Sequence, residues 1–123
     1  MLKDHASSAI VAVSDIDRAR AFYRDTLGLE LESEMGGHVL VFRTGATHLV
    51  VYRSEFAGTN KANAVVWGVG DDIEAIAADL KAKGVAFEHY DGMDWKGDIH
   101  VDGDMKLVWI KDPDGNILHF NNI

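Results

Sequence analysis

Hydrophobic and polar positions follow the same order twice along the chain. In each half, an apolar run typical of a buried strand precedes a segment whose apolar residues recur at helical spacing, and further strands follow. The two helical segments begin at Asp15 and Asp72 and end before Gly28 and Gly84. Two copies are too few for a solenoid, which needs at least about three repeats to bury a continuous core. The pattern therefore predicts one pseudo-symmetric domain.

The first half predicts a strand, a helix and three strands. Ser14 and Asp15 are suitable helix caps, apolar side chains follow at helical spacing, and Gly28 is a typical helix stop. Glycines then separate segments in which apolar residues either alternate with polar ones or follow one another. This pattern is typical of strands joined by turns. The predicted bounds are 9–13 for the first strand, 15–28 for the helix, and 29–34, 38–43 and 47–53 for the later strands.

The second half predicts the same order with a long insertion. Its predicted strands are 64–69, 85–89, 105–111 and 116–121, its helix is 72–83, and a long loop covers 90–104. Asp112-Pro113-Asp114-Gly115 has the proline and glycine of an ordinary turn. We therefore expect a single domain, 1–123, with module one at about 6–53, a polar connection at 54–63 and module two at about 64–123.

Composition narrows the possible partners. The 123 residues are 47% hydrophobic and carry 20 acidic against 12 basic residues, for a net charge of −8. This balance argues against nucleic acid or an anionic membrane as a partner. Without cysteine there is no disulfide, thiolate metal site or cysteine nucleophile. The first apolar run is too short for a signal sequence or membrane span, so we expect a cytoplasmic location.

Two phrases in this repeat carry a family resemblance. They are Val13-Ser14-Asp15-Ile16-Asp17-Arg18-Ala19-Arg20-Ala21-Phe22-Tyr23-Arg24-Asp25-Thr26-Leu27-Gly28 and Lys111-Asp112-Pro113-Asp114-Gly115-Asn116-Ile117-Leu118-His119-Phe120. The chain resembles the vicinal oxygen chelate superfamily, which contains glyoxalase I, bleomycin-resistance proteins and extradiol dioxygenases. The resemblance implies an α+β fold of two βαβββ modules in pseudo-twofold repeat, whose curved mixed sheets form a cup with the helices outside. It also implies a homodimer. One fold hosts many reactions, so it leaves the chemistry open.

The resemblance also implies where a metal would be bound. Metal-dependent members use four cup-facing ligands, and the matching positions here are Ser8, Val50, Val65 or its neighbour Ala64, and His119. Valine cannot ligate a metal and serine is a poor ligand for zinc or iron, so only His119 is chemically competent. We therefore expect no metal and no cofactor. A divalent metal held by His48 together with His38 or His100 is the alternative.

Strand alternation predicts which side chains line the cup. Ser8, Ile10 and Ala12 should face inward if Val11 and Val13 face the helix, and Leu118 and Phe120 should pack under the second helix. The remaining predicted inward sets are His48, Val50 and Tyr52; Val65, Trp67 and Val69; and Ile117, His119 and Asn121. From these sets and the nearby aromatic residues, the predicted ligand-binding residues are Ser8, Val50, Tyr52, Val65, Trp67, Trp95, His100, Trp109 and His119.

The segment 88–104 is the most acidic part of the chain. It carries Glu88, Asp91, Asp94, Asp98, Asp102 and Asp104 against Lys96. At the rim of the cup these carboxylates would attract a cation, and Trp95 would stack on a planar ligand. The alternative is a solvated acidic loop.

Three functional hypotheses follow. The first is metal-independent binding of a small cationic or aromatic molecule, as in bleomycin-resistance proteins. The second is an enzyme, a glyoxalase-type lyase or isomerase or a dioxygenase-like protein, with His119 or His48 as general base and a captured divalent metal. The third is a non-catalytic interaction module. Small-molecule binding is the function that we expect, and whether any catalysis occurs stays open.

Overall fold

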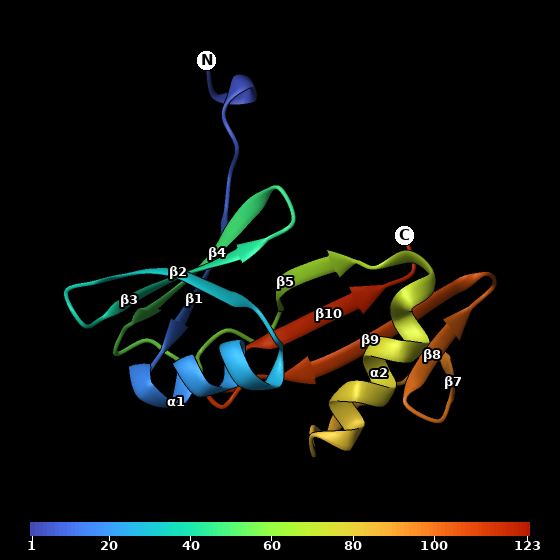
Figure 1. Ribbon diagram of the computed structural model, residues 1–123. Helices are drawn as coiled ribbons and strands as arrows, with labels where there is room; N and C mark the ends of the chain where they lie inside the picture. The colour runs from blue at the N-terminus through green and yellow to red at the C-terminus, as the bar shows by residue number, and fades with distance from the viewer. The chain divides into compact units, whose positions relative to one another are not determined.

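The computed structural model describes residues 1–123, and its contacts divide the chain into two compact units. The first comprises Met1–Lys61 and Pro113–Asn116, and the second comprises Ala62–Asp112 and Ile117–Ile123. Each unit has one mixed sheet and its own helix (Figure 1). The predicted α+β class with two repeated modules is confirmed. No helix combines the length and the apolar character needed to cross a membrane.

The first unit has the predicted strand–helix–three-strand order. Its sheet runs β1-β4-β3-β2, with β1 parallel to β4 and the other pairs antiparallel. Its elements are η1 (Leu2–Asp4), β1 (Ala9–Val13), α1 (Ile16–Ala21), η2 (Phe22–Thr26), β2 (Glu30–Met35), β3 (Val39–Thr44) and β4 (Thr47–Arg53).

The helix of the first unit starts and stops where its caps predict. The Asp15 Oδ1 atom accepts a hydrogen bond from the Arg18 backbone N–H at 3.0 Å, and Gly28 adopts φ +74° after the last turn. Between them, α1 gives way at Phe22 to the π-helical turn η2. The predicted helix is continuous from Ile16 to Thr26, but its last five residues are π-helical. The sequence does not signal this change, because a single π turn barely disturbs the apolar spacing.

Side-chain alternation in the first unit is confirmed. Val11, Val51 and Leu40 are paired across neighbouring strands and are almost fully buried on the face that α1 contacts. Val50 pairs with Ile10, which is 60% exposed, so these two residues lie on the opposite face. Tyr52 and His48 share that face with Val50, as alternation predicts.

The second unit has more strands than the sequence predicts. Its main sheet path is β5-β10-β9-β8-β7, and β6 also pairs with β9. Its elements are β5 (Asn63–Gly68), η3 (Gly70–Asp72), α2 (Ile73–Ala82), β6 (Phe87–Glu88), β7 (Asp94–Lys96), β8 (Ile99–Asp102), β9 (Met105–Lys111) and β10 (Ile117–Asn121).

The predicted loop 90–104 contains a β-hairpin, so the prediction of a continuous loop is wrong. Lys96 pairs with Ile99 across a two-residue turn, Gly97-Asp98, in which Gly97 has φ +64°. A glycine at the first position of a two-residue turn is typical of hairpins. The strands beside it are too short for their alternation to be recognised.

The predicted orientation of Val65 and Trp67 is also wrong. In the parallel pair β5–β10, Trp67 is opposite Phe120 and Val65 is opposite Leu118. The Trp67 and Phe120 rings are stacked, with centroids 5.0 Å apart and planes at 12°. Paired residues project from the same face, so Trp67 cannot point away from Phe120. A register shift between Ile117 and Leu118 displaces this alignment from the one expected for a regular strand.

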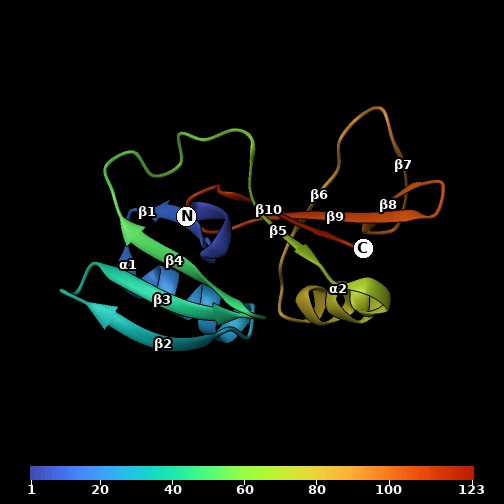
Figure 2. The same cartoon turned by 90° about the horizontal axis from the view of Figure 1, so that it is seen from above.

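Helix α2 lies along one face of the second sheet (Figure 2). One face of β5, β9 and β10 is mainly apolar, with Val65, Trp67, Val108, Ile110, Leu118 and Phe120. The buried side of α2 is apolar as well, with Ile73, Ala77 and Leu80. Apolar stripes of a helix pack on apolar faces of a sheet, so we assign this face to α2.

Candidate ligand-binding site

The other face of the second sheet carries a cluster of aromatic and histidine rings. We call it the aromatic face, and its members are His89, Tyr90, Trp95, His100, Trp109 and His119. Trp109 is its centre, with His119 stacked on it at 4.7 Å and with His100 and Tyr90 edge-on at 5.0 and 5.2 Å between centroids. Such ring arrangements are individually favourable.

Strand register creates this cluster. His119 is opposite Trp109 in the pair β9–β10, and His100 is opposite Trp95 in the pair β7–β8. Directly paired residues of antiparallel strands bring their side chains into contact. Four residues that the sequence predicts to bind a ligand are therefore assembled on one surface: Trp95, His100, Trp109 and His119.

Both ring nitrogens of His119 are engaged within the second unit. Its Nδ1 atom donates to the Val108 carbonyl oxygen at 3.1 Å, and its Nε2 atom accepts from the Asn121 amide at 3.3 Å. The Asn121 side-chain oxygen in turn accepts from the Ile123 N–H. Burial lowers the pKa of His119, and the bond to Val108 opposes this only in part. His119 is thus a neutral imidazole with both ring nitrogens occupied, so a metal ion or a substrate proton could reach Nε2 only by displacing the Asn121 amide.

His100 is held differently, because only one of its nitrogens has a partner. The Nε2 atom accepts from the Tyr90 backbone N–H at 3.0 Å, whereas the buried Nδ1 atom has no hydrogen-bond partner. The side chain is 0% exposed. Burial lowers the pKa of His100 and the neighbouring His89 lowers it further, so the ring is neutral near pH 7.

Tyr90 is a member of the site that sequence analysis missed. Its hydroxyl is buried and also lacks a partner, and its ring centroid is 6.3 Å from that of His100. The only sequence signal was its place directly after a predicted strand, at the start of the charged segment.

The predicted site residues of the first unit do not form a comparable cluster. The Ser8 hydroxyl lies 3.4 Å from that of Thr47, and Val50 and Tyr52 share the sheet face opposite α1. His48 Nε2 lies 2.7 Å from Glu32 Oε2. Glu32 is placed for this contact by a register shift between Leu31 and Ser33 in the β2–β3 pair.

The residues at the family's ligand positions do not fit a metal ion. Val50 and Val65 offer no donor atom. No group of three or more histidine, aspartate or glutamate side chains in either unit could hold an ion. His38 and His48 cannot hold one metal ion together. The His38 carbonyl oxygen accepts a hydrogen bond from the Arg53 backbone N–H at the end of β4, whereas His48 lies near the start of β4, opposite Arg43. They are thus about five residues apart along β4, roughly 17 Å at about 3.3 Å per residue.

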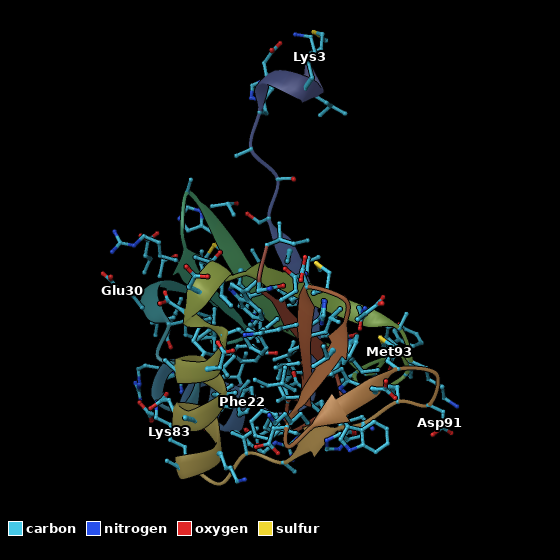
Figure 3. All side chains as sticks on the ribbon, turned by 90° about the vertical axis from the view of Figure 1, so that its right-hand side faces the viewer. Lys3, Phe22, Glu30, Lys83, Asp91 and Met93 are labelled. Carbon is cyan, nitrogen blue, oxygen red and sulfur yellow. The ribbon has the colours of Figure 1, made fainter.

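Most carboxylates of the acidic segment 88–104 have no basic partner. Glu88 pairs with Lys111 at 2.9 Å and Asp98 with Lys81 at 3.4 Å. The other four carboxylates form no ion pair, and they are Asp91, Asp94, Asp102 and Asp104. Figure 3 shows Asp91 at the outer end of the segment that leads into β7. The segment that carries Tyr90, Trp95 and His100 therefore has a net negative charge.

The first unit contains an open hollow that the sequence did not predict. It has a volume of about 580 Å³ and is lined by Ser14, Arg53, Ser54, Glu55 and Ala57. None of the predicted site residues lines it.

Comparison with known proteins identifies the family. The model of the Glyoxalase/Bleomycin resistance protein/Dioxygenase superfamily matches residues 4–120, and the chain belongs to this superfamily. No curated protein matches the sequence.

Solved structures of other proteins share the fold. A glyoxalase family protein from Enterococcus faecalis aligns with a TM-score of 0.74 at 21% identity, over 98% of this chain and 99% of its own. Lactoylglutathione lyase from Agrobacterium tumefaciens aligns with a TM-score of 0.70 at 21% identity, over 95% and 92%. An integron cassette protein from the Halifax Harbour sewage outfall aligns with a TM-score of 0.73 at 17% identity, over 97% and 98%. At these identities the likeness shows the fold alone.

Proposed function

We propose that this chain binds a small planar organic molecule on the aromatic face of the second unit, without a metal ion. The observation that carries the proposal is the pair of buried polar atoms without partners, Tyr90 Oη and His100 Nδ1, within a cluster of stacked rings. Buried polar groups are nearly always hydrogen-bonded, and an exception calls for an explanation such as a ligand or an ordered water. Flat aromatic walls with a few convergent polar atoms are typical of small-molecule sites.

The surroundings of the site favour an uncharged or cationic ligand. The four unpaired carboxylates of the acidic segment repel anions and attract cations. Trp95, 48% exposed, is a member of the aromatic face that solvent reaches. An indole face in an acidic environment is a good surface for a planar cation.

A thermal-shift screen tests the proposal. EDTA-treated full chain is heated with planar aromatic compounds that are cationic, neutral or anionic. At a ligand concentration of 100 Kd, stabilisation is about 2.7 kcal/mol, which is roughly 10 °C in a domain of this size. We expect hits among the cationic or neutral compounds, and we expect Trp95→Ala to remove the shift.

A matched variant controls for the loss of an exposed ring. Phe56 belongs to the first unit and is 69% exposed, so Phe56→Ala should retain the shift. Stabilisation by anionic compounds alone would contradict the proposal. So would hits that respond equally to both substitutions, because binding would then lie outside the aromatic face.

One observation supports a second candidate function, an enzyme of the lyase or isomerase type. The Glu32 carboxylate holds the His48 imidazole at 2.7 Å, and a carboxylate that orients an imidazole is a common arrangement for general-base catalysis. Turnover of a hemithioacetal or catechol that is lost in His48→Ala and retained in His5→Ala would support it. A homodimer and a cytoplasmic location stay predictions.

A further inference from the structure

The hydrogen-bond arrangement of His100 determines which of its ring nitrogens carries the proton. A backbone N–H can only donate, so the His100 Nε2 atom, 3.0 Å from the Tyr90 backbone nitrogen, must accept. In the neutral ring the proton is then on Nδ1. His100 Nδ1–H is therefore a hydrogen-bond donor, fully buried and without an acceptor.

The Tyr90 hydroxyl is a second buried donor of this kind. It too is buried and has no acceptor, and the Tyr90 and His100 rings are 6.3 Å apart and inclined at 32°. The two donors are fixed from both sides, since the Tyr90 N–H holds the His100 ring and Trp109 is edge-on to both rings. Two preorganised donors on neighbouring rings are suited to receiving oxygen acceptors of one small molecule.

We propose that the molecule bound on the aromatic face is a planar carbonyl compound without negative charge, whose oxygen atoms accept hydrogen bonds from Tyr90 Oη–H and His100 Nδ1–H. This inference rests on the proposed function and names its ligand class. A carbonyl oxygen has two lone pairs and no proton, so it complements donors and offers nothing to an acceptor. Carboxylates also accept hydrogen bonds, but the unpaired carboxylates of the segment 88–104, which carries Tyr90 and His100, oppose the binding of an anion.

Access to the donors lies beneath Trp95. Its ring is 5.4 Å from that of His100 and 4.9 Å from that of His89, so it covers the His100 side of the cluster. Trp95 belongs to the three-residue strand β7, which pairs only with β8. Such a short edge strand is held by few hydrogen bonds and can be displaced at low cost. The ligand then occupies the place beside His100 that Trp95 covers, and it stacks on the displaced Trp95 ring.

Two probes of the same shape separate the carbonyl from the ring system. 1-Indanone carries a carbonyl on a planar bicyclic frame, and indane is the same frame without it. Their dissociation constants are measured by calorimetry or ligand-observed NMR on wild type, Tyr90→Phe and Tyr23→Phe, with folding checked by circular dichroism. We expect Tyr90→Phe to weaken 1-indanone binding by roughly 2- to 12-fold, the effect of one hydrogen bond, and to leave indane binding unchanged.

The control lies in the first unit. Tyr23 is a buried tyrosine of α1–η2, remote in sequence from the aromatic face, so Tyr23→Phe should change neither constant. If Tyr90→Phe changes the two constants by the same factor, the carbonyl is not recognised, and the donors are occupied by water alone. The proposed function then stands and this inference fails. If neither probe binds and the wider screen also yields no ligand, both are overturned.

Discussion

The imidazole of His119 lies over the indole of Trp109, with ring centroids 4.7 Å apart and planes at 21°. His119 is 7% exposed, and its two ring nitrogens are hydrogen-bonded to the Val108 carbonyl and the Asn121 amide. The one residue that matches a metal ligand of the family is therefore built into the wall of the site. In this structure its contacts stabilise the position of Trp109 on the aromatic face.

Loss of Trp109 should weaken the second unit considerably. The side chain is 8% exposed, contacts three rings, and donates its Nε1–H to Asn63 Oδ1 at 3.1 Å. We expect Trp109→Ala to lower the free energy of unfolding by about 3–5 kcal/mol, as large-to-small core substitutions do. Urea denaturation measures this. Trp109→Phe should cost less, and equal losses in both variants would show that ring stacking contributes nothing.

Stability should fall as the solution is acidified below the ordinary pKa of histidine. Burial lowers the pKa of His119 and of His100, so the unfolded chain binds protons at a higher pH than the folded chain does. The stability that depends on these two neutral histidines is fully present above about pH 6.5. It is lost as pH falls from there through the folded-state pKa.

The contribution of His119 is obtained by difference. Urea unfolding of wild type and His119→Gln is compared between pH 5.5 and 7.5, since all other histidines are common to both. We expect a shallower pH dependence in the variant. Parallel curves would mean that the pKa of His119 is not lowered on folding.

Removing the Tyr90 hydroxyl should not destabilise the unliganded chain. Removing a tyrosine hydroxyl that makes a hydrogen bond lowers the free energy of unfolding by about 1 kcal/mol. Here the buried hydroxyl has no partner. Tyr90→Phe should therefore leave the free energy of unfolding unchanged or raise it by up to about 1 kcal/mol. A clear loss of stability in urea denaturation would show that the hydroxyl already has a partner in the free protein and needs no acceptor from a ligand.

Asp114 should matter more for stability than its place in a turn suggests. Its carboxylate accepts from the Ser14 N–H at 3.1 Å, the Ser14 hydroxyl at 2.5 Å and Arg18 Nη2 at 3.1 Å, and its side chain is only 7% exposed. Hydrogen bonds to charged groups contribute about 1.5–3 kcal/mol each, and removing the carboxylate leaves their donors without an acceptor.

We expect Asp114→Ala to lower the free energy of unfolding by about 2–4 kcal/mol, measured by urea denaturation. Asp114→Asn, which keeps one acceptor oxygen, should lose less. Asp102→Ala is the matched control, because Asp102 is exposed and forms no ion pair, and it should lie close to wild type. An Asp114→Ala variant as stable as Asp102→Ala would contradict the contribution of these hydrogen bonds.

The repeat in the sequence was sufficient to predict most of the fold. The strands Ala9–Val13, Thr47–Arg53 and Met105–Lys111 have the predicted bounds, because long apolar or alternating runs determine strands well. The short hairpin β7–β8 and the π turn η2 were not predicted. Each depends on one or two turns whose signal is weaker than that of neighbouring segments.

The site was predictable only in part. Alternation correctly placed Val50 on the face opposite α1, but it failed for Trp67, because strand register decides which residues share a face and cannot be derived from one strand alone. Tyr90 was missed because its significance comes from an unpaired hydroxyl, which depends on the arrangement of neighbouring rings. Glu32 was missed because a register shift in β2 directs it toward His48.

The central claim is that the aromatic face of the second unit binds a planar molecule without a metal. A titration of EDTA-treated chain with a hit from the thermal-shift screen, followed by calorimetry on wild type, Trp95→Ala and Trp67→Ala, tests it most directly. Trp67 stacks on Phe120 on the opposite face of the sheet, so its loss should lower stability and leave affinity unchanged. We predict metal-free binding that Trp95→Ala weakens at least tenfold and Trp67→Ala does not; binding that requires an added divalent metal, or that Trp67→Ala alone abolishes, would contradict the account.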